Sequence, residues 1–342
     1  MPTSNASTGN GCQTMTAELQ RFSTNPIVVP SDISFVTASG TFNPGVALDH
    51  ARGVVVLLVR VYDSDTRRSF LTLATSSDGR SIDEVWDTPA VSPDEPYEEW
   101  GVEDARITWF ADEQRYAITY TGYSPSGIRV CLITTDDLLA PERYRRHGPR
   151  MQGDNKNCVI LPEKIDGQYV ILHRPLPRIV CVRTAELESA WPEDGVTLVG
   201  PQPDSWRSAR VGAGAAPIRT ELGWLLPIHG ATTVAEGNIY SMGWCVLDAD
   251  APEKVRYVSD DPVLTPQAPY EIAIDPIPQV DMAVHPTGVR VVFPEGLVEF
   301  GDDLLVYYGA ADVSIAGASV NRTALVESLD AAIRRGEGGL PV

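Results

Sequence analysis

The segment Gly101-Val102-Glu103-Asp104-Ala105-Arg106-Ile107 places two carboxyl groups and a guanidinium close together, next to residues typical of a β-strand. A carboxyl group beside a second acid and an arginine can have a shifted pKa and can serve as a proton donor for cleavage of a glycosidic bond. The alternative is an ordinary salt bridge at the entrance to a strand. The segment alone leaves both open, so the rest of the chain must decide between them.

Five apolar segments, rich in β-branched and aromatic residues, recur roughly every 50 to 80 residues and are predicted to be strands. Each follows a cluster of turn-forming residues and precedes a second strand-like segment. The pattern therefore predicts repeated antiparallel hairpins. The first segments are 54–60, 116–123, 169–174, 224–229 and 304–308, and the second segments are 70–76, 130–135, 180–184, 242–248 and 315–320.

The repeated hairpins, with 27 prolines and 28 glycines, predict an all-β fold, and five units of this size favour a five-bladed β-propeller. Two β-sandwich domains are the alternative. Leu325, Leu329 and Ile333 are spaced four residues apart, so a short C-terminal helix is expected. The predicted domains are a polar N-terminal extension (1–25), the propeller catalytic domain (26–322), and a C-terminal helix and tail (323–342).

Polar residues stand at or just after the ends of several predicted strands. The innermost strands of a propeller converge on a central depression, so residues that are distant in sequence can meet there. One such residue is most simply a satisfied structural group, whereas repetition across the units favours a binding site. These residues include Arg60, Tyr123, His173, Arg174, His229 and Asp312.

The net charge of −19, from 46 acidic and 27 basic residues, argues against nucleic acid and anionic membranes as partners. No apolar run approaches the roughly 18 to 20 residues of a membrane span. The five cysteines lack metal-ligand spacing and are expected to be reduced and mostly buried, and no metal or nucleotide motif occurs. The first 25 residues lack the apolar core of a secretory signal. We therefore expect a cytoplasmic protein, which could be a homo-oligomer.

Several short motifs occur in order along the chain: Phe42-Asn43-Pro44-Gly45, Gly101 to Arg106, Leu161 to Ile165, Leu172-His173-Arg174-Pro175, Gly212-Ala213-Gly214, Gly223 to Gly230, Val292-Phe293-Pro294 and Tyr307 to Asp312. This ordered set resembles glycoside hydrolase family 130 over about residues 25 to 320. The resemblance implies a five-bladed β-propeller that acts on β-mannosides. Members are phosphorylases, which use inorganic phosphate with inversion to give α-mannose 1-phosphate, or hydrolases, which use water.

The resemblance also implies roles for individual residues. Asp104 would be the general acid, and would protonate the glycosidic oxygen indirectly through the mannose 3-hydroxyl. Phosphate would be bound by Lys156, Arg174, Arg210 and His229, since arginine grips phosphate bidentately and lysine adds a compact charge. No cofactor is implied besides phosphate as co-substrate. The residues expected to bind sugar are Asn43, Arg60, Glu103, Tyr123, His173, Tyr240, Phe293 and Asp312.

The clustered bases favour a phosphorylase over an inverting hydrolase of the β-1,2-mannosidase type, because a hydrolase needs a base for water and no phosphate site. Lys156 and Arg210 stand where many phosphorylases carry arginine and lysine respectively, which keeps the charge but can alter phosphate affinity. A lectin and a five-bladed furanosidase are further alternatives, although neither needs clustered bases beside an acid. The linkage and the leaving sugar, whether glucose, N-acetylglucosamine or mannose, stay open.

Overall fold

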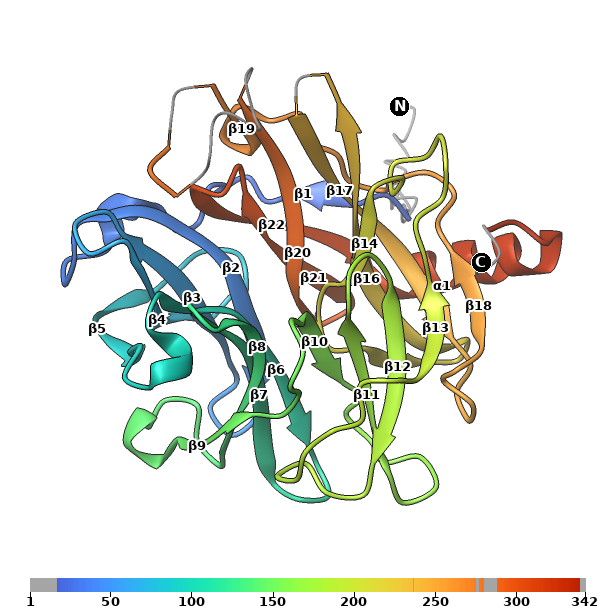
Figure 1. Cartoon of the computed structure of the whole chain (residues 1–342). Coiled ribbons are helices and arrows are strands. Elements are labelled where there is room, and N and C mark those ends of the chain that lie inside the picture. The colour runs from blue at the N-terminus through green and yellow to red at the C-terminus, as the bar shows by residue number, and fades with distance from the viewer. Residues whose placement is uncertain (1–16, 236, 275–276, 280–287, 339–342) are drawn as a thin grey trace, which may run out of the picture.

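The computed structural model describes residues 17–235, 237–274, 277–279 and 288–338, and shows an all-β protein with a short C-terminal helix (Figure 1). Its strands form five successive antiparallel units, numbered here 1 to 5 along the chain. Units 1 to 3 each contain four strands that pair in chain order or nearly so. These strands are β2 (Ala38–Asp49), β3 (Val54–Asp63), β4 (Arg68–Ser76) and β5 (Glu84–Val91) in unit 1, β6 (Gly101–Phe110), β7 (Arg115–Ser124), β8 (Gly127–Thr135) and β9 (Arg145–Pro149) in unit 2, and β10 (Lys156–Ile160), β11 (Tyr169–Arg174), β12 (Ile179–Thr184) and β13 (Val196–Val199) in unit 3.

Unit 4 begins with an interrupted strand. Both β14 (Arg210–Ala213) and β15 (Ile218–Thr220) pair with β16 (Gly223–Val234). The unit continues with β17 (Gly237–Leu247) and β18 (Val255–Val258). The order of antiparallel pairing is therefore the same as in the first three units.

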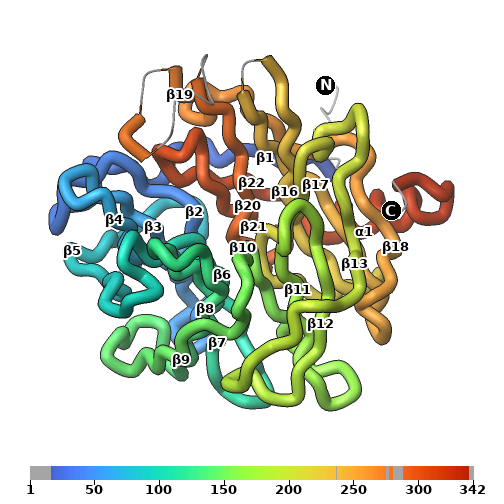
Figure 2. Tube along the Cα trace, in the orientation of Figure 1, coloured from blue at the N-terminus to red at the C-terminus, as the bar shows by residue number. Residues whose placement is uncertain are grey.

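Unit 5 combines the two ends of the described chain. β20 (Val289–Phe300), β21 (Asp303–Ala310) and β22 (Ser314–Asn321) pair in order, and β19 (Ile272–Ala273) pairs with β20. The fourth strand is β1 (Gln20–Arg21), which pairs with β22, so the first and last strands of the chain lie side by side (Figure 2). β1 lies inside the segment 1–25 that the sequence analysis assigned to an extension, so part of this segment belongs to unit 5.

Glycine residues in the left-handed region form several of the turns between strands. Gly53, Gly167 and Gly301 have φ angles of 68°, 75° and 62°. Glycine adopts this conformation at little cost because it has no Cβ. Each of the three lies in a cluster of turn-forming residues that the sequence places before a strand, and the predicted hairpin entries at these positions are thus confirmed.

All ten strand segments predicted from the sequence are strands in the structure. However, they are the second and third strands of each unit, so the sequence analysis did not find the first strand of any unit. The strands that approach one another across the units are the first ones: β2, β6, β10, β14 and β20. The sequence analysis missed them because polar residues, proline and glycine interrupt their apolar pattern, as in Phe42-Asn43-Pro44-Gly45.

One hydrophobic core lies between each pair of neighbouring units. Cores join units 1 and 2, 2 and 3, 3 and 4, and 4 and 5. A fifth core joins unit 5 back to unit 1, with Leu305 and Ile315 beside Val55 and Leu57. The five cores therefore follow one another in a closed cycle. The buried free cysteines in these cores are Cys131, Cys158, Cys181 and Cys245, as expected, whereas Cys12 lies outside the described residues.

The helix predicted at the C-terminus is α1 (Arg322–Arg335), which lies at the periphery (Figure 1). The Asn321 side chain caps its first turn, and Gly336 with a φ of 70° ends it. Leu325 and Leu329 pack into the core between units 4 and 5. Within the described ranges, no helix is both long and apolar enough to cross a membrane. The described residues also include four short 3₁₀ helices: η1 (Pro30–Asp32), η2 (Pro96–Glu98), η3 (Pro141–Arg143) and η4 (Pro269–Glu271).

Candidate active site

A β-bulge interrupts the first strand of four units. The pairing register shifts around Asn43 in β2, Asp104 in β6, Asn157 in β10 and Glu295 in β20. The φ angles of Asn43, Asp104 and Asn157 are 50°, 52° and 54°, in a left-handed region that asparagine and aspartate tolerate better than most residues. Because a bulge turns a side chain out of the regular alternation of a strand, it can aim a polar group at neighbouring units.

Asp104 is held by two side chains of unit 1. Its Oδ1 accepts hydrogen bonds from Asn43 Nδ2 at 3.0 Å and from Arg60 Nη1 at 2.8 Å. Arg60 also donates through Nη2 to Glu103 Oε1 at 2.6 Å. Only 3% of Asp104 is exposed. One guanidinium from β3 therefore bridges the two adjacent carboxyl groups of the sequence motif.

The two carboxyl groups differ in proton affinity. Burial by itself raises the pKa of Asp104, but the charges of Arg60, Lys156 and Arg106 outweigh burial and hold the pKa below its usual range. Burial raises the pKa of Glu103, and the opposing charge of Arg60 does not cancel this effect. In the protein without ligands, Asp104 is therefore the stronger acid of the two.

Arg106, the arginine of the same motif, fixes the backbone at Asp104. Its Nη1 donates to the Asp104 backbone oxygen at 2.7 Å, and its Nε donates to the Gly214 backbone oxygen at 2.9 Å. Its Nη2 lies 2.6 Å from Glu295 Oε1, and both side chains are fully buried. A single guanidinium thus connects the first strands of units 2 and 5 with the segment that follows the first strand of unit 4.

Replacing Glu295 with alanine is expected to lower the free energy of unfolding by about 3 kcal/mol, because it leaves the buried Arg106 charge without its partner. Urea denaturation followed by tryptophan fluorescence measures this loss. The matched control is Glu163→Ala, which removes only an exposed contact of 3.4 Å to Arg219 and is expected to cost less than about 0.5 kcal/mol. Equal stability of the two variants would contradict the role assigned to the buried pair.

A cavity of about 180 Å³, called the reaction cavity here, opens beside Asp104. Asp312 lines it, and Gln279 Nε2 donates to the Asp312 backbone oxygen at 2.6 Å. Tyr240 and Phe293 supply an aromatic side, with ring centroids 5.7 Å apart. Polar groups beside aromatic rings are suited to binding a sugar ring. The lining residues are Phe42, Asn43, Arg60, Asp104, Lys156, Tyr240, Gln279, Val291, Phe293 and Asp312.

The Asp312→Asn variant tests the electrostatics of this cavity. Burial raises the pKa of Asp312 to about 6, although Arg60 opposes it. Between about pH 4 and 6 the folded protein therefore binds more protons at this group than the unfolded chain, so stability falls as pH rises through this interval. We expect the free energy of unfolding of the variant to exceed that of the wild type by about 1 to 2 kcal/mol at pH 8, a figure reduced to allow for screening of the charge by water. At pH 4 the two free energies should be equal. Thermal unfolding at both pH values measures the difference, and a gain independent of pH would argue against it.

A second cavity of about 570 Å³, called the outer cavity here, adjoins the reaction cavity. The two share Arg60, Lys156 and Gln279. The outer cavity is lined by Arg60, Tyr62, Arg67, Trp100, Glu103, Tyr123, Ile128, Lys156 and Gln279. The two cavities are therefore neighbours, and Asp104 lines only the reaction cavity.

Three of the four bases predicted to bind phosphate, Arg174, Arg210 and His229, lie behind the aromatic side of the reaction cavity and do not line it. Arg174 Nη1 lies 3.3 Å from His229 Nε2, and the His229 ring centroid lies 4.1 Å from that of Phe293. The Arg210 guanidinium carbon lies 5.6 Å from the Tyr240 ring centroid. Lys156 lines both cavities. Side chains from units 3 and 4 thus bring positive charge to the site.

Burial makes the environment of these bases unfavourable for positive charge. Burial lowers the pKa of Arg174 to about 10 and also lowers the pKa of Lys156. Burial lowers the pKa of His229 well below its usual value, and the charges of Arg174 and the other bases add to this effect. Within the described part of the chain, Lys156, Arg174 and Arg210 form no ion pair, whereas Arg60 is paired with two carboxylates. Three cations without ion pairs are an arrangement that a bound anion would stabilise.

The close packing of this cluster explains a glycine in the Gly212-Ala213-Gly214 motif. A Cβ on Gly212 would lie 2.5 Å from the His229 ring and 3.1 Å from Arg174 Cδ. Any larger residue would displace one of the two bases. The first glycine of the motif is thus needed for close packing at the basic cluster.

The structure separates the predicted sugar-binding residues into three groups. Asn43, Arg60, Tyr240, Phe293 and Asp312 line the reaction cavity, whereas Glu103 and Tyr123 line only the outer cavity. His173 lines neither cavity: it is fully buried, and its Nδ1 lies 2.7 Å from Asn155 Nδ2. The Asn155 side chain also accepts from the Arg174 backbone N–H. Asn155 thus connects His173 to Arg174, and a contact between His173 and a sugar stays a prediction.

The sequence analysis missed several lining residues. Gln279 lines both cavities, and Phe42 and Val291 line the reaction cavity. Phe42 directly precedes Asn43 in a motif already singled out, so its position offered a signal. Gln279 stands in a segment between strands where nothing in the sequence indicates its direction.

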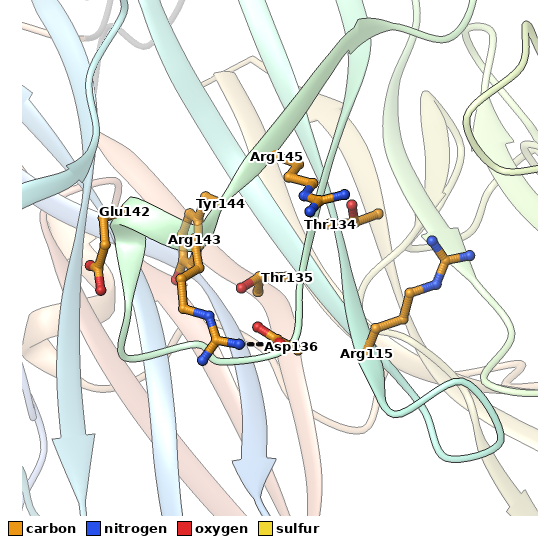
Figure 3. Close-up of a pocket in the computed structure, with 8 residues that line it drawn as sticks. All are labelled: Arg115, Thr134, Thr135, Asp136, Glu142, Arg143, Tyr144 and Arg145. Atoms are coloured by element: carbon orange, nitrogen blue, oxygen red, sulfur yellow. Dashed lines mark hydrogen bonds and ion pairs between the residues drawn. The ribbon is translucent and has the colours of Figure 1, made fainter.

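A separate hollow of about 440 Å³ lies at the outer edge of unit 2 (Figure 3). It is open and polar, and an ion pair joins Arg143 to Asp136 at its rim. It contains none of the predicted site residues and no group with the burial of Asp104. The lining residues are Arg115, Thr134, Thr135, Asp136, Glu142, Arg143, Tyr144 and Arg145.

A buried acid, clustered bases and a cavity lined by aromatic and polar groups are typical of enzymes that act on carbohydrates. The model of glycoside hydrolase family 130, described as beta-1,4-mannooligosaccharide phosphorylase, matches residues 18–331. The chain belongs to this family, which confirms the resemblance found in the sequence.

Individual relatives agree with this assignment. A beta-1,2-mannobiose phosphorylase from Listeria innocua is 34% identical over 273 residues, which cover 78% of this chain and 70% of that protein. A 1,2-beta-oligomannan phosphorylase from a Thermoanaerobacter species is 31% identical over 310 residues, which cover 88% of this chain and 96% of that protein. The solved complex of the Listeria innocua phosphorylase with beta-1,2-mannobiose has a TM-score of 0.78 at 29% identity, and covers 92% of this chain and 99% of that one.

Proposed function

We propose that the protein is an inverting β-mannoside phosphorylase. The observation that carries the proposal is the cluster of Lys156, Arg174 and Arg210 on the side of Asp104, none of which forms an ion pair with a carboxylate among the described residues. Gathered like charges repel one another unless an anion neutralises them. This cluster is more notable in a protein with a net charge of −19. A phosphorylase needs a site for phosphate, whereas an inverting hydrolase needs a base that activates water.

In the proposed reaction, a mannose unit occupies the reaction cavity and phosphate approaches the opposite face of the ring from the leaving group. Protonated Asp104 donates to the mannose 3-hydroxyl oxygen, and the proton of that hydroxyl passes to the glycosidic oxygen. The bond between this oxygen and the anomeric carbon breaks while a phosphate oxygen bonds to the anomeric carbon. The products are α-mannose 1-phosphate and the shortened saccharide, and the step uses no cofactor.

We further propose that the five units, from β1 to β22, are the blades of a five-bladed β-propeller. The closed cycle of five hydrophobic cores supports this arrangement. A cavity of about 270 Å³, lined by residues on or after the first strand of every unit, also supports it. Such a ring closes by packing between blades, so it needs no closed hydrogen-bonded sheet. The cytoplasmic location and the homo-oligomer expected from the sequence stay predictions.

The first linkage to test is β-1,2. The two relatives described above are named for β-1,2-linked substrates, at 34% and 31% identity. A relative from Ruminococcus albus that is named beta-1,4-mannooligosaccharide phosphorylase is 28% identical. Comparison of β-1,2- and β-1,4-linked mannobiose as substrates decides between these linkages.

Reverse phosphorolysis tests the function whichever linkage the enzyme forms, because phosphate is released in every case. The purified protein is incubated with α-mannose 1-phosphate and a panel of acceptors that includes mannose, glucose and N-acetylglucosamine, and phosphate release is measured. Release with one acceptor supports the proposal and names the leaving group. No release with any acceptor, together with mannose release from β-mannobioses in phosphate-free buffer, would instead identify an inverting hydrolase.

A further inference from the structure

We propose that the outer cavity binds the leaving-group part of the substrate, that this part is an oligosaccharide, and that Trp100 is the platform on which it stacks. The inference rests on the proposed function and assigns the substrate class and a specificity residue. It starts from Trp100, an aromatic side chain that is 42% exposed although it stands only four residues before Asp104. A large, partly exposed apolar group in the lining of a cavity suggests contact with a ligand.

Trp100 and Tyr123 form a joined aromatic surface on one side of the outer cavity. Their ring centroids are 4.9 Å apart and their planes meet at 71°. The Trp100 backbone N–H donates to the Tyr123 backbone oxygen at 2.8 Å. Two rigid aromatic rings offer a large contact area at little cost in conformational entropy, which suits the apolar face of a sugar ring.

The segment that carries Trp100 is anchored by the buried carboxyl group of Glu98, which has no part in the proposed reaction. Glu98, in η2, is fully buried and accepts hydrogen bonds from Tyr120 at 2.6 Å and from Arg146 Nη1 at 2.7 Å. Gly101 follows Trp100 with a φ of 153°, and a Cβ there would lie 2.8 Å from the Ser69 backbone nitrogen. The aromatic surface is therefore held in place before any ligand binds, as a binding platform requires.

The sizes of the two cavities indicate how long the leaving group is. The reaction cavity of about 180 Å³ is the smaller one and holds Asp104, so it takes the single mannose unit that is transferred. The outer cavity of about 570 Å³ is roughly three times as large. It thus has room for at least two further sugar units. Tyr62, Arg67 and Glu103 supply donors and acceptors for their hydroxyl groups.

The test compares acceptors of increasing length in reverse phosphorolysis. We measure kcat/KM for mannose, β-1,2-mannobiose and β-1,2-mannotriose with the wild type, Trp100→Ala and Trp100→Phe. The quantity compared is the kcat/KM for mannotriose divided by the kcat/KM for mannose. Trp100→Ala is expected to lower this ratio by roughly tenfold, because the KM for mannotriose rises. Trp100→Phe is expected to keep most of the wild-type ratio. The KM for phosphate should change less than about twofold. Val196→Ala, on the outer strand β13 and 48% exposed, is the control that should leave every value unchanged.

Two results would overturn the inference while the proposed function stands: a Trp100→Ala ratio equal to that of the wild type, or an equal loss for mannose and mannotriose. If the wild type releases no phosphate with any acceptor, the proposed function fails first, and binding is measured instead. Calorimetry then compares β-1,2-mannotetraose binding to Asp104→Asn with its binding to the Asp104→Asn/Trp100→Ala double variant. Weaker binding to the double variant would support the platform, and equal affinity would refute it.

Discussion

Replacing Asp104 with asparagine is expected to lower kcat for phosphorolysis by about 10³-fold, within the range of 10² to 10⁴ typical for loss of a general acid. Asparagine has nearly the same shape as aspartate, so its oxygen can still accept from Asn43 and Arg60, which now hold Asp104 at 3.0 and 2.8 Å. It cannot supply the proton that the glycosidic oxygen requires. The loss should therefore fall on kcat, with a small change in the KM for phosphate.

The measurement is the initial rate of α-mannose 1-phosphate formation from a β-mannoside at saturating phosphate. Circular dichroism and thermal unfolding show whether the variant is folded. Asp302→Asn, in the exposed turn between β20 and β21, is the matched control and should keep full activity. If Asp104→Asn retains more than about a tenth of the wild-type kcat, Asp104 is not the acid.

The charges around Asp104 make its protonation state depend on whether phosphate is bound. Without ligands, Arg60, Lys156 and Arg106 overcome the effect of burial and keep the pKa of Asp104 below its usual range. A bound phosphate dianion opposes this positive potential and so raises the pKa of the same carboxyl group. We therefore expect Asp104 to hold its proton in the phosphate complex and to lose it in phosphate-free protein. This coupling would make water a poor replacement for phosphate as the nucleophile.

The second and third strands of each unit could be predicted because their pattern reflects burial alone. β3 and β11, for example, are runs of β-branched and aliphatic residues that end in Asp63 and Arg174, and every predicted segment of this kind is a strand. The first strands serve two purposes. They pack against one another and they also carry bulges at Asn43 and Asp104 that aim polar groups into the site. Their mixed composition hides them from a search for apolar periodicity.

The candidate site divides in the same way. Residues inside strong motifs, such as Asp104 and Asp312, could be named from the sequence because the motif carries them. Glu295 and Trp100 could not be named from the sequence, because their roles depend on contacts between segments that are separated along the chain. Glu295 in unit 5 lies 2.6 Å from Arg106 in unit 2, and the Trp100 ring packs against the Tyr123 ring. His173 is the opposite case: it lies in a motif, but its side chain contacts Asn155 and lines neither the reaction cavity nor the outer cavity.

Replacing Arg174 with alanine is expected to raise the KM for phosphate by roughly 10- to 100-fold, because charge-assisted hydrogen bonds to a phosphate are among the strongest polar contacts. The KM for the β-mannoside should change less than about threefold, since Arg174 does not line the reaction cavity. Initial rates over a matrix of phosphate and mannoside concentrations separate the two constants. Arg178→Ala removes an exposed arginine from the turn between β11 and β12 and should leave both constants unchanged.

Stability measurements distinguish loss of a phosphate ligand from general damage to the fold. Arg174 is buried, and burial lowers its pKa to about 10, so without phosphate the protein bears the cost of an unneutralised cation. The alanine variant should then be at least as stable as the wild type in phosphate-free buffer. Added phosphate stabilises the folded state in proportion to RT ln(1 + [L]/Kd), so the wild type should gain several degrees in Tm at concentrations where the variant gains little. A variant that is less stable than the wild type without phosphate, yet responds equally to it, would show that Arg174 supports the fold and does not bind the nucleophile.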